Sequence, residues 1–75
     1  MKLVELNDNE RGKIKKIECH GKIKKRLLEM GFMKGETIER KKCAPLADPI
    51  EFVIKNYHIS LRRSEAEHII IDKVS

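Results

Sequence analysis

Two cysteines and three histidines are the side chains best suited to chemistry, and they are scattered along the chain. They are Cys19, His20, Cys43, His58 and His68. No Cys-x-x-Cys or His-x-x-x-His pair is present, so the sequence offers no preformed pair of metal ligands. Thiols and imidazoles suit a transition metal if folding brings them together, which leaves all five as weak candidates for a metal site. The competing interpretation is that both cysteines are small buried apolar residues.

The same residues, and the glycines of the chain, give little support for a catalytic function. Cys19 and His20 are neighbours, and adjacent side chains on a strand point to opposite faces, so they are poorly placed to form a thiol–imidazole pair. The four glycines of the chain fit neither a P-loop nor a dinucleotide-binding spacing. A chain of 75 residues also has little material to surround an enclosed substrate pocket. The sequence therefore predicts a protein that binds a partner and is not an enzyme.

The charge of the chain indicates the kind of partner. Lys and Arg number 17 against 12 Asp and Glu, a formal net charge of +5. Such a surface attracts nucleic acid, an anionic membrane face or an acidic protein. Binding of single-stranded nucleic acid and of proline-rich peptides both use exposed aromatic side chains. Because the chain has no Trp, one Tyr and two Phe, neither kind of binding is expected.

The expected location is the cytoplasm. No apolar run approaches the length of about 20 residues needed to cross a bilayer, so no membrane insertion is predicted. Residues Met1 to Glu10 lack the apolar region of a signal peptide. In a cytoplasmic protein the cysteines are expected to be reduced.

The first half of the chain predicts a strand followed by a helix. A strand is expected over Lys13–Cys19, with a bulge or bend because the step from Ile14 to Ile17 breaks strict alternation. Apolar residues then recur with helical spacing over Lys22–Met30, which predicts a short amphipathic helix. Gly31 follows as a residue that tolerates the positive φ of a helix C-terminus.

The second half predicts strands separated by turns. A strand is expected over Glu36–Cys43, followed by a rigid loop at Ala44–Pro49, which contains two prolines. Two alternating segments, Ile50–Ile54 and Tyr57–Leu61, are separated by the pair Lys55-Asn56 and predict a β-hairpin. His58 is out of phase with the apolar residues of its strand and is expected to face solvent.

The chain is expected to end with one helical turn and a last strand. Ser64 and Glu67 have the spacing of a capping box, and the β-branched run Ile69–Ile71 predicts a strand. The fold class is mainly β with short helices, a small five-stranded barrel with one amphipathic helix after strand 1 and one helical turn before the last strand. The predicted core is Ile14, Ile17, Leu27, Ile38, Ile50, Phe52, Ile54, Ile59, Leu61, Ile69 and Ile71.

Short groups of residues over the whole chain resemble the FeoA family, the small cytosolic accessory proteins of bacterial ferrous iron uptake. They are Gly12 and Ile17; Arg26-Leu27, Met30-Gly31-Phe32 and Gly35; Ala44-Pro45-Leu46 and Asp48-Pro49-Ile50; Leu61-Arg62, Glu65-Ala66 and Ile69. Two residues depart from the family pattern. Ala47 stands where the family often has Gly, and Tyr57 stands where a Gly often completes the hairpin turn.

The resemblance implies an SH3-like barrel that forms one domain over residues 1–75. Because the chain begins at Met1 and has no helix-turn-helix, a standalone protein is expected. The implied function is regulation of ferrous iron uptake by binding the cytosolic side of FeoB, a membrane Fe²⁺ transporter with a GTPase region. Fe²⁺ is implied by this pathway only, and no intrinsic cofactor is predicted. The alternative is a small metal-sensing module that binds Fe²⁺ or another transition metal directly.

The predicted partner-binding surface lies between the Lys22–Met30 helix, with the turn that follows it, and the Ala44–Pro49 loop. Leu28 lies about 100° from Leu27 around a helix, away from the expected buried face. So small a core need not bury the four apolar residues Leu28, Phe32, Met33 and Leu46, although they could also cap the ends of the barrel. Neighbouring basic residues would steer an acidic partner. The predicted surface consists of Lys24, Lys25, Arg26, Leu28, Phe32, Met33 and Leu46.

Overall fold

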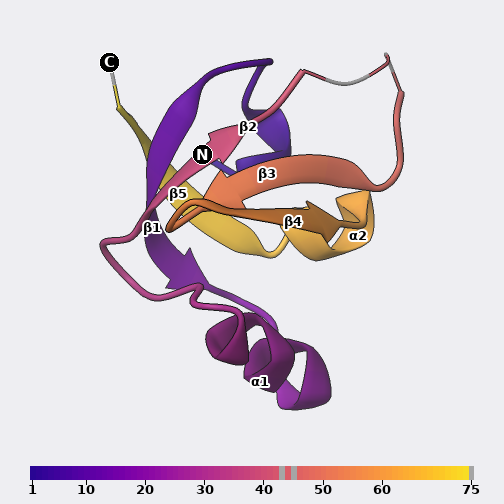
Figure 1. Ribbon diagram of the computed structural model, residues 1–75. Coiled ribbons are helices and arrows are strands. Elements are labelled where there is room, and N and C mark those ends of the chain that lie inside the picture. The colour runs from indigo at the N-terminus through magenta and orange to yellow at the C-terminus, as the bar shows by residue number, and fades with distance from the viewer. Residues whose placement is uncertain (43, 45, 75) are drawn as a thin grey trace.

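The computed structural model describes residues 1–42, 44 and 46–74 (Figure 1). In chain order its elements are the 3-10 helix η1 (Leu3–Glu5), β1 (Arg11–Ile17), α1 (Gly21–Glu29), β2 (Thr37–Arg40), β3 (Ile50–Ile54), β4 (Tyr57–Leu61), α2 (Arg63–Ala66) and β5 (Ile69–Val74). This order confirms the predicted mainly β fold, with a helix after the first strand and a helical turn before the last. Within these residues, no helix is both long and apolar enough to cross a bilayer.

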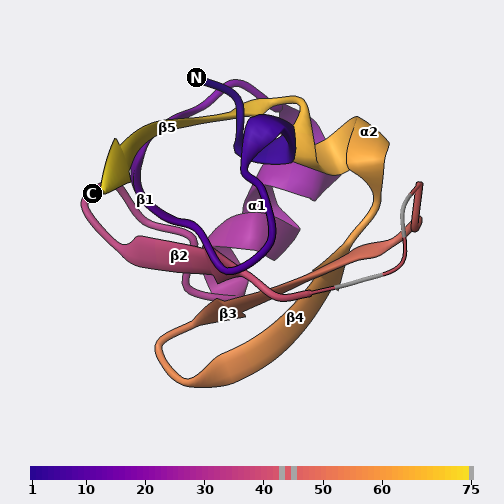
Figure 2. The same cartoon turned by 90° about the horizontal axis from the view of Figure 1, so that it is seen from above.

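The five strands form one antiparallel sheet in the order β4-β3-β2-β1-β5. The sheet curls so that β3 and β4 lie on the opposite side from β5 (Figure 2). No hydrogen-bonded ladder joins β4 to β5 in the part of the chain that the structure describes. The barrel is therefore open between these two strands. Among the described residues, the outer edge of β4 has no partner, and the outer edge of β5 pairs only with the N-terminal segment at Met1 and Lys2.

Strand β1 contains the predicted bulge. Its pairing with β5 shifts between Ile14 and Lys16, which leaves Lys15 as the extra residue. The strand ends at Ile17, so Cys19 follows it instead of belonging to it. Ile14 is buried, whereas Ile17 is only partly buried and packs against the core, so the core prediction holds only in part for Ile17. A bulge bends the strand that contains it, and Ile17 lies after this bend.

Strands β3 and β4 form the predicted hairpin. Lys55 and Asn56 both have positive φ, 51° and 66°, as a two-residue type I′ turn requires. Along β4 the core-facing side chains become less buried toward the turn: Leu61 is buried, Ile59 is partly buried and Tyr57 is 70% exposed. Ile59 was predicted as a core residue, and it packs against the core but is only partly buried.

Helix α2 begins one residue before the predicted capping box. The Arg62 N–H donates to Glu65 Oε1 at 2.9 Å, so Glu65 closes the first turn of the helix and Glu67 does not. Ser64 lies inside the helix, which corrects its predicted role as the cap. Ala66 is the residue of α2 that reaches the core.

The N-terminal segment packs on the barrel, which the sequence did not predict. Leu3 and Leu6 are buried, and Met1 pairs with Ile71 of β5 through two backbone hydrogen bonds of 2.8 and 3.0 Å. Arg40 of β2 holds this segment in place, since its Nη1 donates to the Leu6 carbonyl at 2.6 Å. The segment thus shields part of the outer edge of β5.

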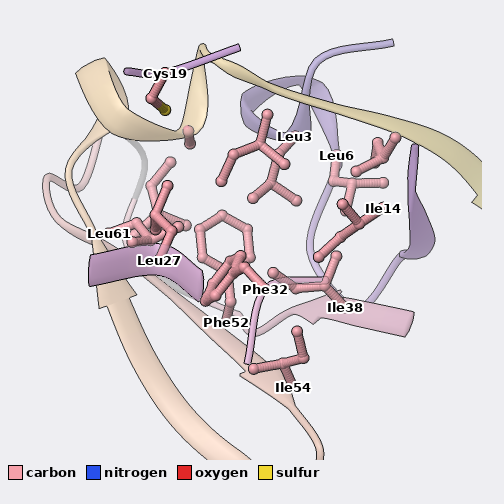
Figure 3. Packing of buried hydrophobic residues seen from close by; sticks show 14 residues of the cluster. Leu3, Leu6, Ile14, Cys19, Leu27, Phe32, Ile38, Phe52, Ile54 and Leu61 are labelled. Atoms are coloured by element: carbon pink, nitrogen blue, oxygen red, sulfur yellow. The ribbon is translucent and has the colours of Figure 1, made fainter. Parts of the chain in front are cut away.

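One apolar cluster fills the barrel, with Phe32 and Phe52 near its centre (Figure 3). Of the predicted core residues, all except Ile17 and Ile59 are buried. The cluster also contains residues outside that prediction, namely Leu3, Leu6, Cys19, Phe32 and Ala66.

Candidate partner-binding surface

Helix α1 lies outside the barrel (Figure 1). Leu27 is the one residue of the helix that is buried. An ion pair adds a second attachment, since Arg26 Nη1 lies 3.3 Å from Glu65 Oε2, and the Glu65 side chain is only 12% exposed. Most of the helix surface is therefore open to a partner.

The C-terminus of α1 explains why Phe32 is not part of that surface. Gly31 adopts φ 95°, the Gly31 N–H donates to the Leu28 carbonyl at 3.0 Å, and the Phe32 N–H donates to the Leu27 carbonyl at 3.0 Å. This is a Schellman motif, in which the residue after the glycine packs against the residue five positions earlier. Phe32 and Leu27 are both completely buried, so the prediction of Phe32 as an exposed partner-binding residue was wrong.

Ile23 is a second correction. The apolar spacing placed it on the buried face with Leu27, yet it is 46% exposed. The helix contacts the core through Leu27 in its C-terminal half, and Ile23 lies one turn earlier. Leu28 is also 46% exposed and Met33 is 53% exposed, as predicted. Three exposed apolar side chains therefore belong to α1 and the turn that follows it.

The predicted basic residues lie on the same helix. Lys24 and Lys25 are exposed, and neither forms an ion pair with any of the described residues. Arg26 is 55% exposed even though it contacts Glu65. The helix thus presents positive charge next to Leu28, the arrangement that accelerates the approach of an acidic partner.

Leu46 is the exposed apolar residue of the predicted 44–49 loop. It is 90% exposed and has φ 61°, an uncommon backbone conformation for a bulky residue. The loop is tied to α2, because the Arg63 N–H donates to Asp48 Oδ1 at 3.0 Å and Arg63 Nε donates to the Ala47 carbonyl at 2.9 Å. Leu46 therefore projects from a segment that is anchored on one side.

Helix α1 and the 44–49 segment do not form one cleft. Figure 1 shows the helix at one end of the molecule and the segment away from it, near α2, and the two are also apart in Figure 2. The predicted single surface is instead two separate apolar groups, one around α1 and one at Leu46. Sequence reasoning missed the exposed apolar side chains Ile23 and Tyr57. Ile23 has helical spacing to the buried Leu27, and Tyr57 alternates in phase with Ile59 and Leu61, so both patterns predicted buried faces.

The structure describes four of the five candidate metal ligands and does not bring these four into one site. Cys19 is buried, and His20, His58 and His68 are exposed, with His58 Nδ1 3.0 Å from Glu51 Oε1. Cys43 lies outside the described residues. Among the residues whose positions are described, no group of three His, Cys, Asp or Glu side chains could hold one ion.

The surroundings of Cys19 also disfavour metal binding by its thiol. Burial raises the pKa of the Cys19 thiol, and the nearby Glu65 carboxylate raises it further. Since the thiolate is the form that binds metals and attacks electrophiles, a raised pKa makes Cys19 a poor ligand at neutral pH. Its burial agrees with the interpretation of this cysteine as a small apolar core residue.

Comparison with known proteins gives a match to the FeoA domain family over residues 1–73. Over all 75 residues the chain is 43% identical to the Fe(2+) transport protein A/Fe(2+) transporter FeoB fusion protein of Porphyromonas gingivalis. The chain covers 9% of the length of that fusion protein.

Solved structures show the same fold. The iron(II) transport protein A of Clostridium thermocellum is 42% identical with a TM-score of 0.91, over 99% of this chain and 46% of that one. The FeoA of Stenotrophomonas maltophilia is 29% identical with a TM-score of 0.84, over 96% of this chain and 89% of that one. That protein is described as complexed with zinc and as a procaryotic SH3 domain protein. The SH3-like architecture expected from the sequence is thereby confirmed.

Proposed function

The chain belongs to the FeoA family, whose members are associated with ferrous iron transport, and from this premise we propose that it regulates bacterial ferrous iron uptake by binding the cytosolic side of a FeoB-type transporter. In this role it is an accessory protein of the cytoplasm. The GTPase region of the transporter is the part that a small soluble regulator reaches.

The observation that carries the proposal is the fusion protein of Porphyromonas gingivalis. There, a segment 43% identical to this entire chain is joined in one polypeptide to a FeoB transporter. Joining two modules makes their association intramolecular and raises the effective concentration of each to the millimolar range. Such a link is useful when the two parts act side by side, and it supports association between the separate proteins.

The surface proposed for this association is α1 with the turn that follows it. Leu28 and Met33 supply exposed apolar area, and Lys24 and Lys25 supply positive charge. Leu46 belongs to the binding surface only if the partner also covers the 44–49 segment. The separation of the two groups makes the contributions of Leu28 and Leu46 independently measurable.

The test is binding of the purified chain to the soluble GTPase region of a FeoB-type transporter, measured with and without guanine nucleotide. Leu28→Ala is expected to weaken binding by about tenfold, mainly through faster dissociation, with little change in stability. Lys24→Glu is expected to slow association and to make it less sensitive to salt. The matched control is Lys13→Glu, an equal charge reversal at an exposed residue of β1.

Two results would contradict the proposal. One is the absence of binding in every nucleotide state. The other is equal slowing of association by Lys24→Glu and Lys13→Glu, which would mean that net charge alone, and not the α1 surface, drives the encounter.

A further inference from the structure

Strand β4 carries a free sheet edge with a definite set of unpaired backbone groups. The Lys41 N–H donates to the Glu51 carbonyl, so the backbone of Glu51 faces β2 and the backbones of its neighbours Ile50 and Phe52 face β4. Phe52 is paired with Ile59 in the β3–β4 register. The N–H and C=O groups of His58 and Ser60 consequently point away from the sheet, and none of the described residues bonds to them.

The side chains beside this edge are suited to an added strand. Tyr57 and Ile59 lie on the core-facing side of β4 but are 70% exposed and partly buried, respectively. A strand added along β4 would place every second side chain on that same face, next to Tyr57 and Ile59. Apolar residues at alternate positions of the added strand would therefore cover apolar surface that β4 leaves open.

The usual protection of a sheet edge is missing from β4. Natural edges carry charged residues, proline or a covering segment. The free edge of β5 has such protection, since Met1 pairs with Ile71 and the strand contains Asp72 and Lys73. Strand β4 reads Tyr-His-Ile-Ser-Leu, with no proline and no carboxylate or lysine. The edge of β4 therefore has no protective residue of these kinds within the strand and, among the described residues, no segment that pairs with it.

The charges at the two ends of β4 indicate what the added strand is. Lys55 lies in the turn before the strand and Arg62 just after it, and both are exposed, although Lys55 Nζ also lies 3.5 Å from Glu36 Oε1. A second copy pairing antiparallel about Ile59 would bring the basic residues that flank one β4 strand close to those that flank the other, which is repulsive. A strand with acidic residues at its ends would meet a basic residue at each end of β4.

We propose that the free edge of β4 binds an extended peptide segment of another protein by strand addition, a segment that is apolar at alternate positions and acidic at its ends. The backbone groups of His58 and Ser60 supply the hydrogen bonds, and Tyr57 and Ile59 supply the apolar contact. Lys55 and Arg62 select for the acidic ends. This edge is distinct from the α1 surface, so a negative result here leaves the proposed association with the transporter untouched.

The probe is the blocked synthetic peptide Glu-Val-Thr-Val-Thr-Val-Glu, titrated into isotopically labelled protein at millimolar concentration. Binding is expected to shift the amide resonances of β4 and to slow hydrogen exchange at His58 and Ser60 by about tenfold, because these amides become hydrogen-bonded. The control peptide has Lys at both ends and is expected to bind at least about tenfold more weakly.

Three variants of the protein test the mechanism. Ser60→Pro removes one outward N–H without removing a bond within the sheet, and it is expected to weaken binding by about tenfold. Ser60→Thr keeps the N–H and is expected to bind like the unmodified protein. Arg62→Glu lies outside the strand, so its effect does not depend on whether β4 tolerates proline. It leaves one basic and one acidic residue at the two ends of β4 and is expected to remove most of the preference for the acidic peptide.

Several outcomes would overturn the proposal. They are no binding of the acidic peptide, equal binding of both peptides, or unchanged binding by both Ser60→Pro and Arg62→Glu. Protection of His58 and Ser60 that grows with protein concentration alone would assign the edge to a second copy of the chain, and this result also contradicts an acidic partner.

Discussion

Phe32 and Met33 are adjacent apolar residues with opposite surroundings. Phe32 is completely buried and Met33 is 53% exposed. Composition alone does not separate them, and both were expected at the partner surface. What separates them is backbone geometry at the end of α1, where Gly31 turns the chain so that Phe32 enters the core above Leu27.

The two residues make a matched pair for a stability measurement. Phe32→Ala is expected to lower the free energy of unfolding by about 3–5 kcal/mol, because it leaves a cavity in the centre of a small core. Met33→Ala is expected to change it by less than about 0.5 kcal/mol, since the side chain is largely in water. Urea denaturation monitored by circular dichroism measures both. Equal losses for the two variants would mean that Phe32 is not a core residue.

Cys19 gives the molecule a specific pH dependence. The pKa of its thiol is raised in the folded state, first by burial and then by Glu65. Stability from keeping this thiol neutral is fully present below the unfolded pKa of about 8.5 and is lost as the pH rises through the higher folded value. Cys19→Ala is therefore expected to remove part of the loss of stability above about pH 8.5. Denaturation of both proteins at neutral and alkaline pH, in a Cys43→Ser background, tests this; identical pH profiles would contradict it.

At the scale of elements, local patterns in the sequence predicted most of the fold. Strand β3 was predicted with its actual bounds, because strict alternation and a following two-residue turn are both local signals. The segment before β1 was missed, since Leu3 and Leu6 become core residues only through contacts with β5 and Arg40, which are distant in sequence. The same reason explains Ile23, whose exposure depends on which part of α1 packs against the barrel. The Met-Gly-Phe sequence indicated a helix end at which Phe32 packs back on Leu27, but Phe32 was interpreted as part of a surface turn.

The pairing of β1 with β5 depends on a glycine. A Cβ at Gly12 would lie 2.6 Å from Ile71 Cδ1, which is closer than packed atoms allow, and 3.2 Å from the Asp72 carbonyl oxygen, which is a tight contact. Gly12→Ala is expected to cost about 1–3 kcal/mol of stability through this overpacking.

Ile71→Val removes the atom that the new methyl group would meet. On its own it is expected to cost about 0.5–1.5 kcal/mol. The double variant is expected to be more stable than the sum of the two single losses predicts, because Ile71→Val relieves the clash. A melting series on the four proteins measures the coupling, and strict additivity would contradict the predicted contact.

At the scale of the whole molecule, the chain is a small barrel of an accessory family. It has 75 residues, no P-loop spacing among its glycines, and nothing in its sequence that would hold a nucleotide with magnesium. The purified chain is expected to hydrolyse no GTP, measured as phosphate release over hours. Activity that co-purifies through successive columns and tracks with the protein peak would contradict this prediction.

Metal binding is the alternative function, and the Stenotrophomonas maltophilia protein complexed with zinc makes it worth measuring. The scattered histidines and the buried Cys19 of this chain predict no specific site. Titration with Co²⁺ is therefore expected to give no visible absorption band and no shift in melting temperature. A stoichiometric band would identify the chain as a metal-binding module, and its loss in Cys19→Ser or Cys43→Ser would show which thiol is the ligand.

The pairing of β1 with β5 also sets the order of events during protein synthesis. One edge of β1 is covered by β2, but the other is covered only by β5, and Ile69 follows Ile17 by 52 residues. A ribosome adds about 5–20 residues per second, so β1 waits roughly 3 to 10 s for its second partner. During that interval the emerging chain carries an isoleucine-containing strand with one open edge, which is the kind of segment that molecular chaperones shield. Completion of the sheet is thus a late event, and a ribosome that stalls before Ile69 leaves one edge of β1 without a partner.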